Sequence, residues 1–96
     1  MFNTITEIRH ANKAAGHHWF EPATMRFFNT RVGKAVFGGR YFVSSEKGPN
    51  GVRAYSVREA LNTGAIETVG EFQAYATGRD AIRAAQALAA SQSATV

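Results

Sequence analysis

The sequence of 96 residues predicts a single α+β domain: an antiparallel meander of about four strands, with N- and C-terminal helices packed on one face. Two observations support this prediction. Helical periodicity with capping residues occurs near both ends of the chain, whereas alternating segments separated by glycine-rich turns fill the middle. A sheet covered in this way leaves its opposite face for solvent or a partner.

The first helix is predicted over residues 4–15. Thr4 is followed three residues later by Glu7, a capping-box pattern in which side chains satisfy the free backbone donors of the first turn. Apolar residues then recur at helical spacing. Gly16 can adopt the left-handed conformation that ends a helix.

A second, short helix is predicted from Pro22 to about Phe28. Proline suits the first turn of a helix, and Asn29 is a plausible left-handed stop. The alternative is that residues 25–31 already form a strand, since short apolar segments fit either period.

The middle of the chain predicts a meander. Residues 31–37 and 40–45 flank Gly38 and Gly39, which form a two-residue hairpin turn. Asn50-Gly51 marks the next turn, and residues 52–58 alternate as a third strand.

Residues 65–72 predict a fourth strand, weakened by Gly70. The last helix begins after Thr77, which with Asp80 repeats the capping-box pattern, and alanines supply high helical propensity. We expect residues 91–96 to fray.

Residues 23–58 carry the strongest functional signal. Seven Lys or Arg occur there against the single acid Glu46, and most of the large aromatic residues lie in the same span. Residues 1–58 hold nine cations and three acids, whereas the rest of the chain holds two cations and four acids. Cations interleaved with aromatic residues favour a binding surface for a polyanion or an acidic protein face.

The strand alternation leaves two interpretations of the aromatic residues. If Arg40 and Phe42 face outward near Arg53, they form a platform for stacking bases or pairing phosphates. Otherwise the aromatic residues fill the core while arginine stems shield it. The residues concerned are Phe27, Phe28, Phe37, Tyr41, Phe42 and Tyr55.

His17, His18 and Trp19 lie in the predicted connection between the two N-terminal helices. Trp19 is a candidate anchor for a partner, because exposed tryptophan is enriched at binding hot spots. His10 and Glu21 complete the one set that suggests a metal site, but its spacing matches no standard motif. We therefore expect no metal and no cofactor.

No catalytic signature accompanies the basic segment. The sequence has no cysteine and no Gly-x-Ser-x-Gly elbow. Glu67 and Glu71 share one strand face, where solvated charges are ordinary. The glycines separate predicted strands instead of leading into a helix as a phosphate-binding loop does. We expect the protein not to be an enzyme.

The sequence predicts a cytoplasmic protein without a membrane partner. No window approaches the roughly 18 apolar residues of a membrane span, and the first residues do not resemble a secretory signal. The absence of cysteine fits a reducing compartment.

Three segments resemble small uncharacterised accessory proteins of tailed phages and prophages. They are residues 20–32, 39–46 and 53–58, and the likeness extends over roughly residues 5–75. The resemblance implies a phage accessory gene expressed in the host bacterial cytoplasm. Proteins of that kind often bind a host protein or nucleic acid, including defence machinery. The resemblance carries no assigned catalytic residues.

The leading functional prediction is a non-enzymatic binding protein that modulates or inhibits a host macromolecule. A host protein with an acidic surface is the favoured partner. The alternatives are binding of RNA or single-stranded DNA, and a structural or self-assembling phage component that pairs through sheet edges. The sequence leaves the oligomeric state open. The predicted contact residues are His17, His18, Trp19, Arg26, Arg31, Arg40 and Arg53.

Overall fold

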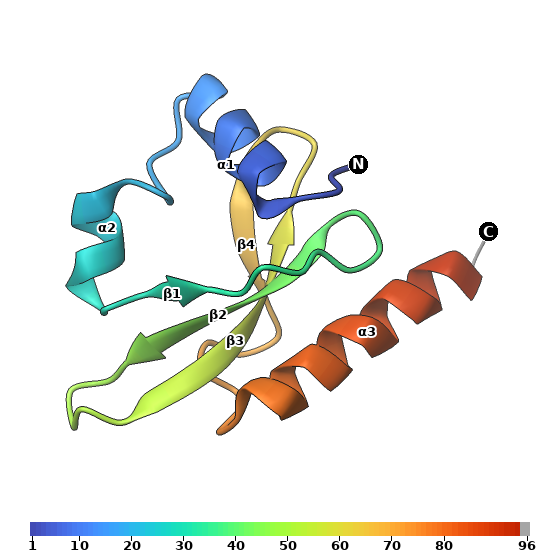
Figure 1. Cartoon of the computed structure of the whole chain (residues 1–96). Coiled ribbons are helices and arrows are strands. Elements are labelled where there is room, and N and C mark those ends of the chain that lie inside the picture. Colours follow the sequence, from blue (N-terminus) through green and yellow to red (C-terminus); the bar gives the residue numbers. More distant parts are fainter. Residues whose placement is uncertain (95–96) are drawn as a thin grey trace.

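A computed structural model, which describes residues 1–94, shows an α+β fold built on a four-stranded antiparallel sheet in the order β1-β2-β3-β4 (Figure 1). The predicted fold class is therefore confirmed. The elements are α1 (Ile5–Ala14), α2 (Pro22–Phe27), β1 (Arg31–Val32), β2 (Tyr41–Lys47), β3 (Arg53–Ala60), β4 (Ile66–Val69) and α3 (Gly78–Ala94). The predicted fraying of residues 91–96 stays a prediction, because residues 95–96 lie outside the described part.

The helices begin where the capping residues predict. The hydroxyl of Thr4 accepts a hydrogen bond from the backbone N–H of Glu7 at 3.2 Å. At α3, the hydroxyl of Thr77 accepts from the N–H of Asp80 at 3.2 Å. The region of α2 is helical and not a strand, and Asn29 follows it with a φ of 51°. These ends are set locally, so the sequence locates them well.

The first strand is much shorter than predicted. Only Arg31 and Val32 pair with β2, and the chain then leaves the sheet before Phe37 bridges to Tyr41. The detour buries Val36 beside the apolar cluster on the α1 side of the sheet. The fourth strand is also shorter than predicted, and it ends just before a left-handed glycine at position 70.

The helices lie on opposite faces of the sheet, so the prediction that they share one face is wrong (Figure 1). Tyr41 and Val43 pack in one cluster with alanines of α3. Phe42, between them, packs in a second cluster with Ile8 of α1. Successive residues of a strand point to opposite faces, and here both sets are apolar, so both faces require cover.

Candidate functional site

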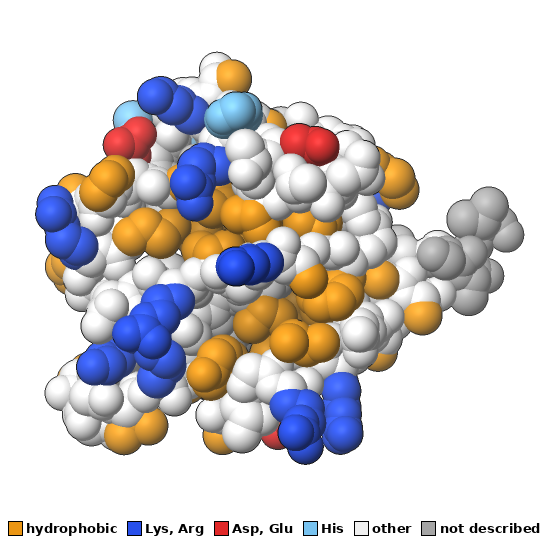
Figure 2. Space-filling model, viewed as in Figure 1, with side chains coloured by type: hydrophobic (Ala, Val, Ile, Leu, Met, Phe, Trp, Pro, Cys, Tyr) orange, Lys and Arg blue, Asp and Glu red, His pale blue; other side chains and the backbone are white. Residues whose placement is uncertain are grey.

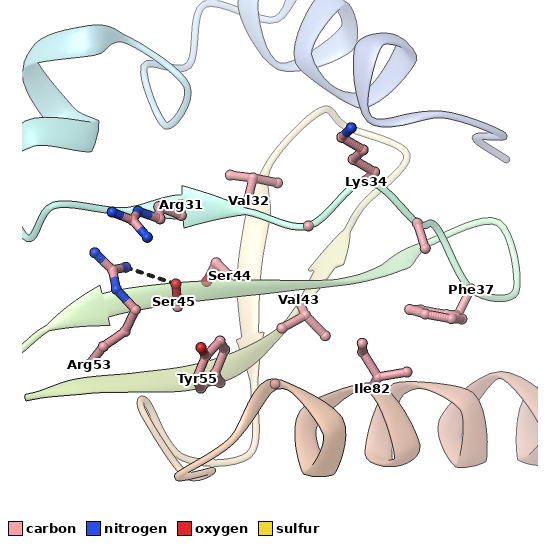
Figure 3. A pocket seen from close by; sticks show the side chains of 13 residues that line it. Arg31, Val32, Lys34, Phe37, Val43, Ser44, Ser45, Arg53, Tyr55 and Ile82 are labelled. Atoms are coloured by element: carbon pink, nitrogen blue, oxygen red, sulfur yellow. Dashed lines mark hydrogen bonds between the residues drawn. The ribbon is translucent and has the colours of Figure 1, made fainter.

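A hollow of about 310 Å³ lies on the α3 face, between the segment that continues β1 and the first turns of α3 (Figure 3). Its wall includes apolar side chains of the sheet and of α3, among them Val43, Tyr55 and Ile82. Ile82 is 40% exposed although it is large and apolar. The hollow therefore offers apolar surface that the fold itself leaves uncovered.

Short side chains place α3 close to one part of the sheet. Ala81 and Ala85 are the fully buried residues of α3 in the cluster with Val43. At the start of the helix, a Cβ on Gly78 would come within 3.3 Å of the Tyr55 ring. The helix thus sits tightly over the centre of the sheet, while the edge beyond it remains open.

The lining of this hollow includes cations, and Arg31 and Arg53 stand together at one end of it (Figure 3). Arg31, Lys34 and Arg53 contribute to its wall, and none of the 13 described residues that line it is Asp or Glu. Figure 2, in the view of Figure 1, shows apolar side chains between the sheet and α3 and Lys and Arg at several places on the same surface. The local charge suits an anionic ligand.

Arg53 has one buried donor without a partner. Its Nη1 donates to Ser45 Oγ at 2.8 Å, which fixes the guanidinium against β2. Its Nη2 is buried and has no hydrogen-bond partner, the one such side-chain atom found in the described part of the chain. Leaving a buried donor unsatisfied costs about 1–3 kcal/mol.

Arg31 stands at the same end of the hollow. It is the antiparallel partner of Ser45, the residue whose hydroxyl accepts from Arg53. Both guanidinium groups appear at that end in Figure 3. Within residues 1–94, neither arginine takes part in an ion pair. Two adjacent cations without a counterion form a local surplus of positive charge.

The opposite face holds a fully partnered arginine. Arg58 Nη2 lies 3.1 Å from Glu46 Oε2, and its Nε donates to Ser44 Oγ at 2.9 Å. The Ser44 hydroxyl in turn donates to Glu46 at 2.7 Å. The rings of Trp19 and Phe72 both lie 5.3 Å from the guanidinium carbon. Arg58 Nη1 donates to Thr68 Oγ1, so each nitrogen of the guanidinium has a partner and the cluster is closed.

Sequence reasoning missed this cluster. Glu46 was read only as the single acid of a basic segment, yet it is just 1% exposed. The available signal was that Ser44 and Glu46 share one strand face with the apolar Phe42 on β2. Their partners Ser56 and Arg58 on β3 could be assigned only once the strand register was known.

A family model described as a family of unknown function, DUF7447, matches residues 4–86. The protein belongs to the DUF7447 family. The match extends from α1 into α3 and so includes every residue that lines the hollow. No curated protein and no solved structure matches the chain significantly.

Of the seven predicted contact residues, the DUF7447 fold brings only Arg31 and Arg53 to one hollow. Arg40 is paired with Glu59 at 3.3 Å. Arg26 is exposed on α2, apart from that hollow.

His17 and His18 are exposed after α1, and His17 lines a separate hollow with residues of α1 and α2. Trp19 is half-buried and packs on Phe42, with ring centroids 5.7 Å apart. Its packing is that of a core residue.

Of the two interpretations of the aromatic residues, the outward platform of Arg40, Phe42 and Arg53 is the one that the structure excludes. Phe42 is completely buried, and the register places it opposite Arg58, on the other face from Arg53. The core interpretation holds for Tyr41 and Phe42, and Phe37 and Tyr55 pack against the same core as Tyr41. It is wrong for Phe27 and Phe28, which are exposed.

Three phenylalanines form an exposed cluster at α2. Phe27 is 79% exposed, Phe28 43% and Phe72 46%. Their rings contact in series, at centroid distances of 4.7 Å and 6.0 Å. The DUF7447 protein therefore presents a second apolar surface, and Arg26 lies beside it in sequence.

Two features are absent from the described residues of the DUF7447 protein, a cluster of metal ligands and a membrane-spanning helix. Among them, His, Asp and Glu nowhere gather in a group of three or more that could hold a metal ion. None of the helices in residues 1–94 has the length and apolar character needed to cross a membrane.

Proposed function

We propose that this DUF7447 protein is a non-enzymatic binding domain that holds an acidic segment of a partner protein in the α3-face hollow. The observation that carries the proposal is the composition of that hollow, in which Arg31 and Arg53 stand at one end of an apolar wall with no acid among its described residues. Such a site recognises charge at its rim and apolar surface in its interior.

The apolar wall favours a protein segment over a nucleic acid. A phosphate backbone gains from many dispersed cations, each of which releases a counterion. The hollow supplies two arginines at one end of a wall that includes Val43 and Ile82, whose side chains offer nothing to a phosphate. An acidic peptide with one large apolar side chain uses both features.

The resemblance to phage accessory proteins suggests which class of protein the partner belongs to. On that basis the acidic segment belongs to a host protein, which the domain occupies and so modulates or inhibits. This biological context rests on the resemblance alone, and the binding chemistry rests on the hollow.

Selection from a displayed library of random peptides tests the proposed function. We expect the recovered peptides to be enriched in Asp and Glu. Their binding should fall at least about tenfold in an Arg31→Ala, Arg53→Ala double variant, because hydrogen bonds to charged groups contribute about 1.5–3 kcal/mol each.

The matched control is the Arg79→Ala, Arg83→Ala double variant. It loses the same charge from exposed positions of α3 that do not line the hollow. Equal losses in the two double variants would show a non-specific charge effect and contradict the proposed site.

The exposed phenylalanine cluster favours a second candidate function, the binding of single-stranded nucleic acid. Base–aromatic stacking contributes about 1–3 kcal/mol per base. If this candidate holds, Phe27→Ser and Phe72→Ser each weaken binding of a fluorescent oligonucleotide, and affinity falls steeply with salt. An affinity that does not change with salt would eliminate it.

A further inference from the structure

We propose that Arg31 and Arg53 form a clamp for a carboxylate whose carrier places an apolar group in the adjoining hollow. The ligand class is an Asp or Glu side chain, or a chain-terminal carboxylate, next to a large apolar side chain. This inference rests on the proposed function and specifies its ligand chemistry.

The fixed orientation of Arg53 is the first step. Ser45 holds Nη1 at 2.8 Å, so the planar guanidinium is oriented before any ligand arrives. Its Nη2 is left buried without an acceptor. A carboxylate accepts two parallel N–H bonds from a guanidinium, whereas a neutral carbonyl supplies one oxygen. A carboxylate that displaces the groups covering Nη2 would therefore relieve the cost of the unpartnered donor.

The position of Arg31 is the second step. It extends from β1 to the same end of the hollow, directly across the strand pair from Ser45. The protein pairs other arginines of the sheet region, Arg40 with Glu59 and Arg58 with Glu46. Arg31 and Arg53 have no acid partner in the described chain, so a ligand carboxylate would supply the counterion for both.

The apolar wall separates a carboxylate carrier from a simple anion. Val43, Tyr55 and Ile82 line the hollow, whose volume of about 310 Å³ is at the lower end of small-molecule sites. Each methylene group buried there contributes about 0.8 kcal/mol. A free phosphate makes no use of this surface.

Four probes followed by NMR amide shifts test the clamp in the full chain. Hexanoate combines a carboxylate with an apolar chain, hexanamide replaces the charge with a neutral amide of the same shape, acetate lacks the chain, and inorganic phosphate supplies a different anion. We expect hexanoate to shift the signals of Ser45, Tyr55 and Ile82 with a millimolar Kd. The other three should bind at least about tenfold more weakly, the equivalent of about 1.4 kcal/mol.

Two variants link the shifts to the clamp. Arg53→Ala should weaken hexanoate at least about tenfold. Arg53→Lys keeps the charge but loses the planar fork, so it should restore only part of the affinity. Thermal unfolding of each variant checks that the fold is retained, and Arg83→Ala serves as the charge control.

Each contrary result is decisive. Hexanamide binding as tightly as hexanoate would overturn the clamp, and phosphate or acetate binding as tightly would overturn the role of the apolar wall. Unchanged hexanoate binding in Arg53→Ala would also overturn the proposal.

The experiments can refute the clamp and the proposed function independently of each other. Acidic peptides that depend on Arg31 and Arg53 but need no apolar neighbour would preserve the function and refute this ligand class. Hexanoate binding as expected, with no acidic peptide recovered, would preserve the clamp and refute the function.

Discussion

Arg53 and Arg58 lie on the same strand, five positions apart, and on opposite faces of the sheet. Arg58 is 8% exposed, and its charge is balanced by Glu46. Arg53 has one hydroxyl partner and one buried donor with none. One residue type in one strand thus occupies two different environments.

The difference between the partners of Arg58 and Arg53 distinguishes a structural arginine from one that a ligand can use. A buried charge with a complete set of partners stabilises the arrangement around it, and removing one partner leaves the other uncompensated. A held but incompletely partnered charge at the rim of a hollow contributes little to the fold and is available to a ligand. On this basis we propose that Arg58 serves folding and Arg53 serves binding.

The largest expected effect on stability is at Arg58, in the closed cluster with Glu46. Arg58→Ala should lower the free energy of unfolding by about 3–5 kcal/mol, because it leaves the carboxylate of Glu46 buried and uncompensated. Chemical denaturation measures this loss. Replacing both partners together, with Arg58→Met and Glu46→Leu, should recover part of it. A loss below about 1 kcal/mol for Arg58→Ala would contradict the structural role of Arg58.

An intermediate effect on stability is expected at Asn12, whose side chain links α1 to the turn between β3 and β4. Its side chain donates to the carbonyl of Gly64 at 2.8 Å and accepts from the N–H of Trp19 at 3.2 Å. Asn12→Ala should lower the free energy of unfolding by about 1–3 kcal/mol, because both backbone groups lose their partner. Asn62→Ala, an exposed neighbour in the same turn region, is the control. Equal stability of the two variants would contradict this role.

A smaller effect is expected at Thr77, which caps the helix above the hollow. Thr77→Ala should cost about 1 kcal/mol because the N–H of Asp80 loses its acceptor. Thr77→Ser keeps the hydroxyl and should stay close to wild type. Thermal unfolding distinguishes the two, and an equal loss in both would exclude capping as the cause.

The smallest effect on stability is expected at Arg53 itself. Arg53→Ala removes the bond to Ser45 but also the unpartnered donor, so the free energy of unfolding should change by about 0.5 kcal/mol or less. The same denaturation series used for Arg58 measures it. A loss as large as that of Arg58→Ala would show that the two faces do not differ.

Local signals predicted much of the fold. Thr4 and Thr77 mark helix starts through contacts three residues away, and such contacts are readable from sequence. The placement of helices on both faces was not predicted. It depends on Tyr41 and Phe42 both being buried, and neighbouring apolar residues in a strand do not reveal whether one or both faces are covered.

The candidate site was predicted only in part. Arg31 and Arg53 were chosen with Arg26 and Arg40 because all are cations in one basic segment. The sequence could not separate them, since the pairing of Arg40 with Glu59 depends on which residues of β2 and β3 lie opposite each other. The hollow itself arises from the early exit of the chain from β1, a tertiary effect.

The most direct measurement is an amide-shift map of the wild-type protein with an acidic peptide recovered from the displayed library. Our account predicts that the largest shifts fall on Arg31, Ser45, Tyr55 and Ile82, around the α3-face hollow. Shifts centred on the exposed phenylalanine cluster of α2, with the hollow unaffected, would contradict it.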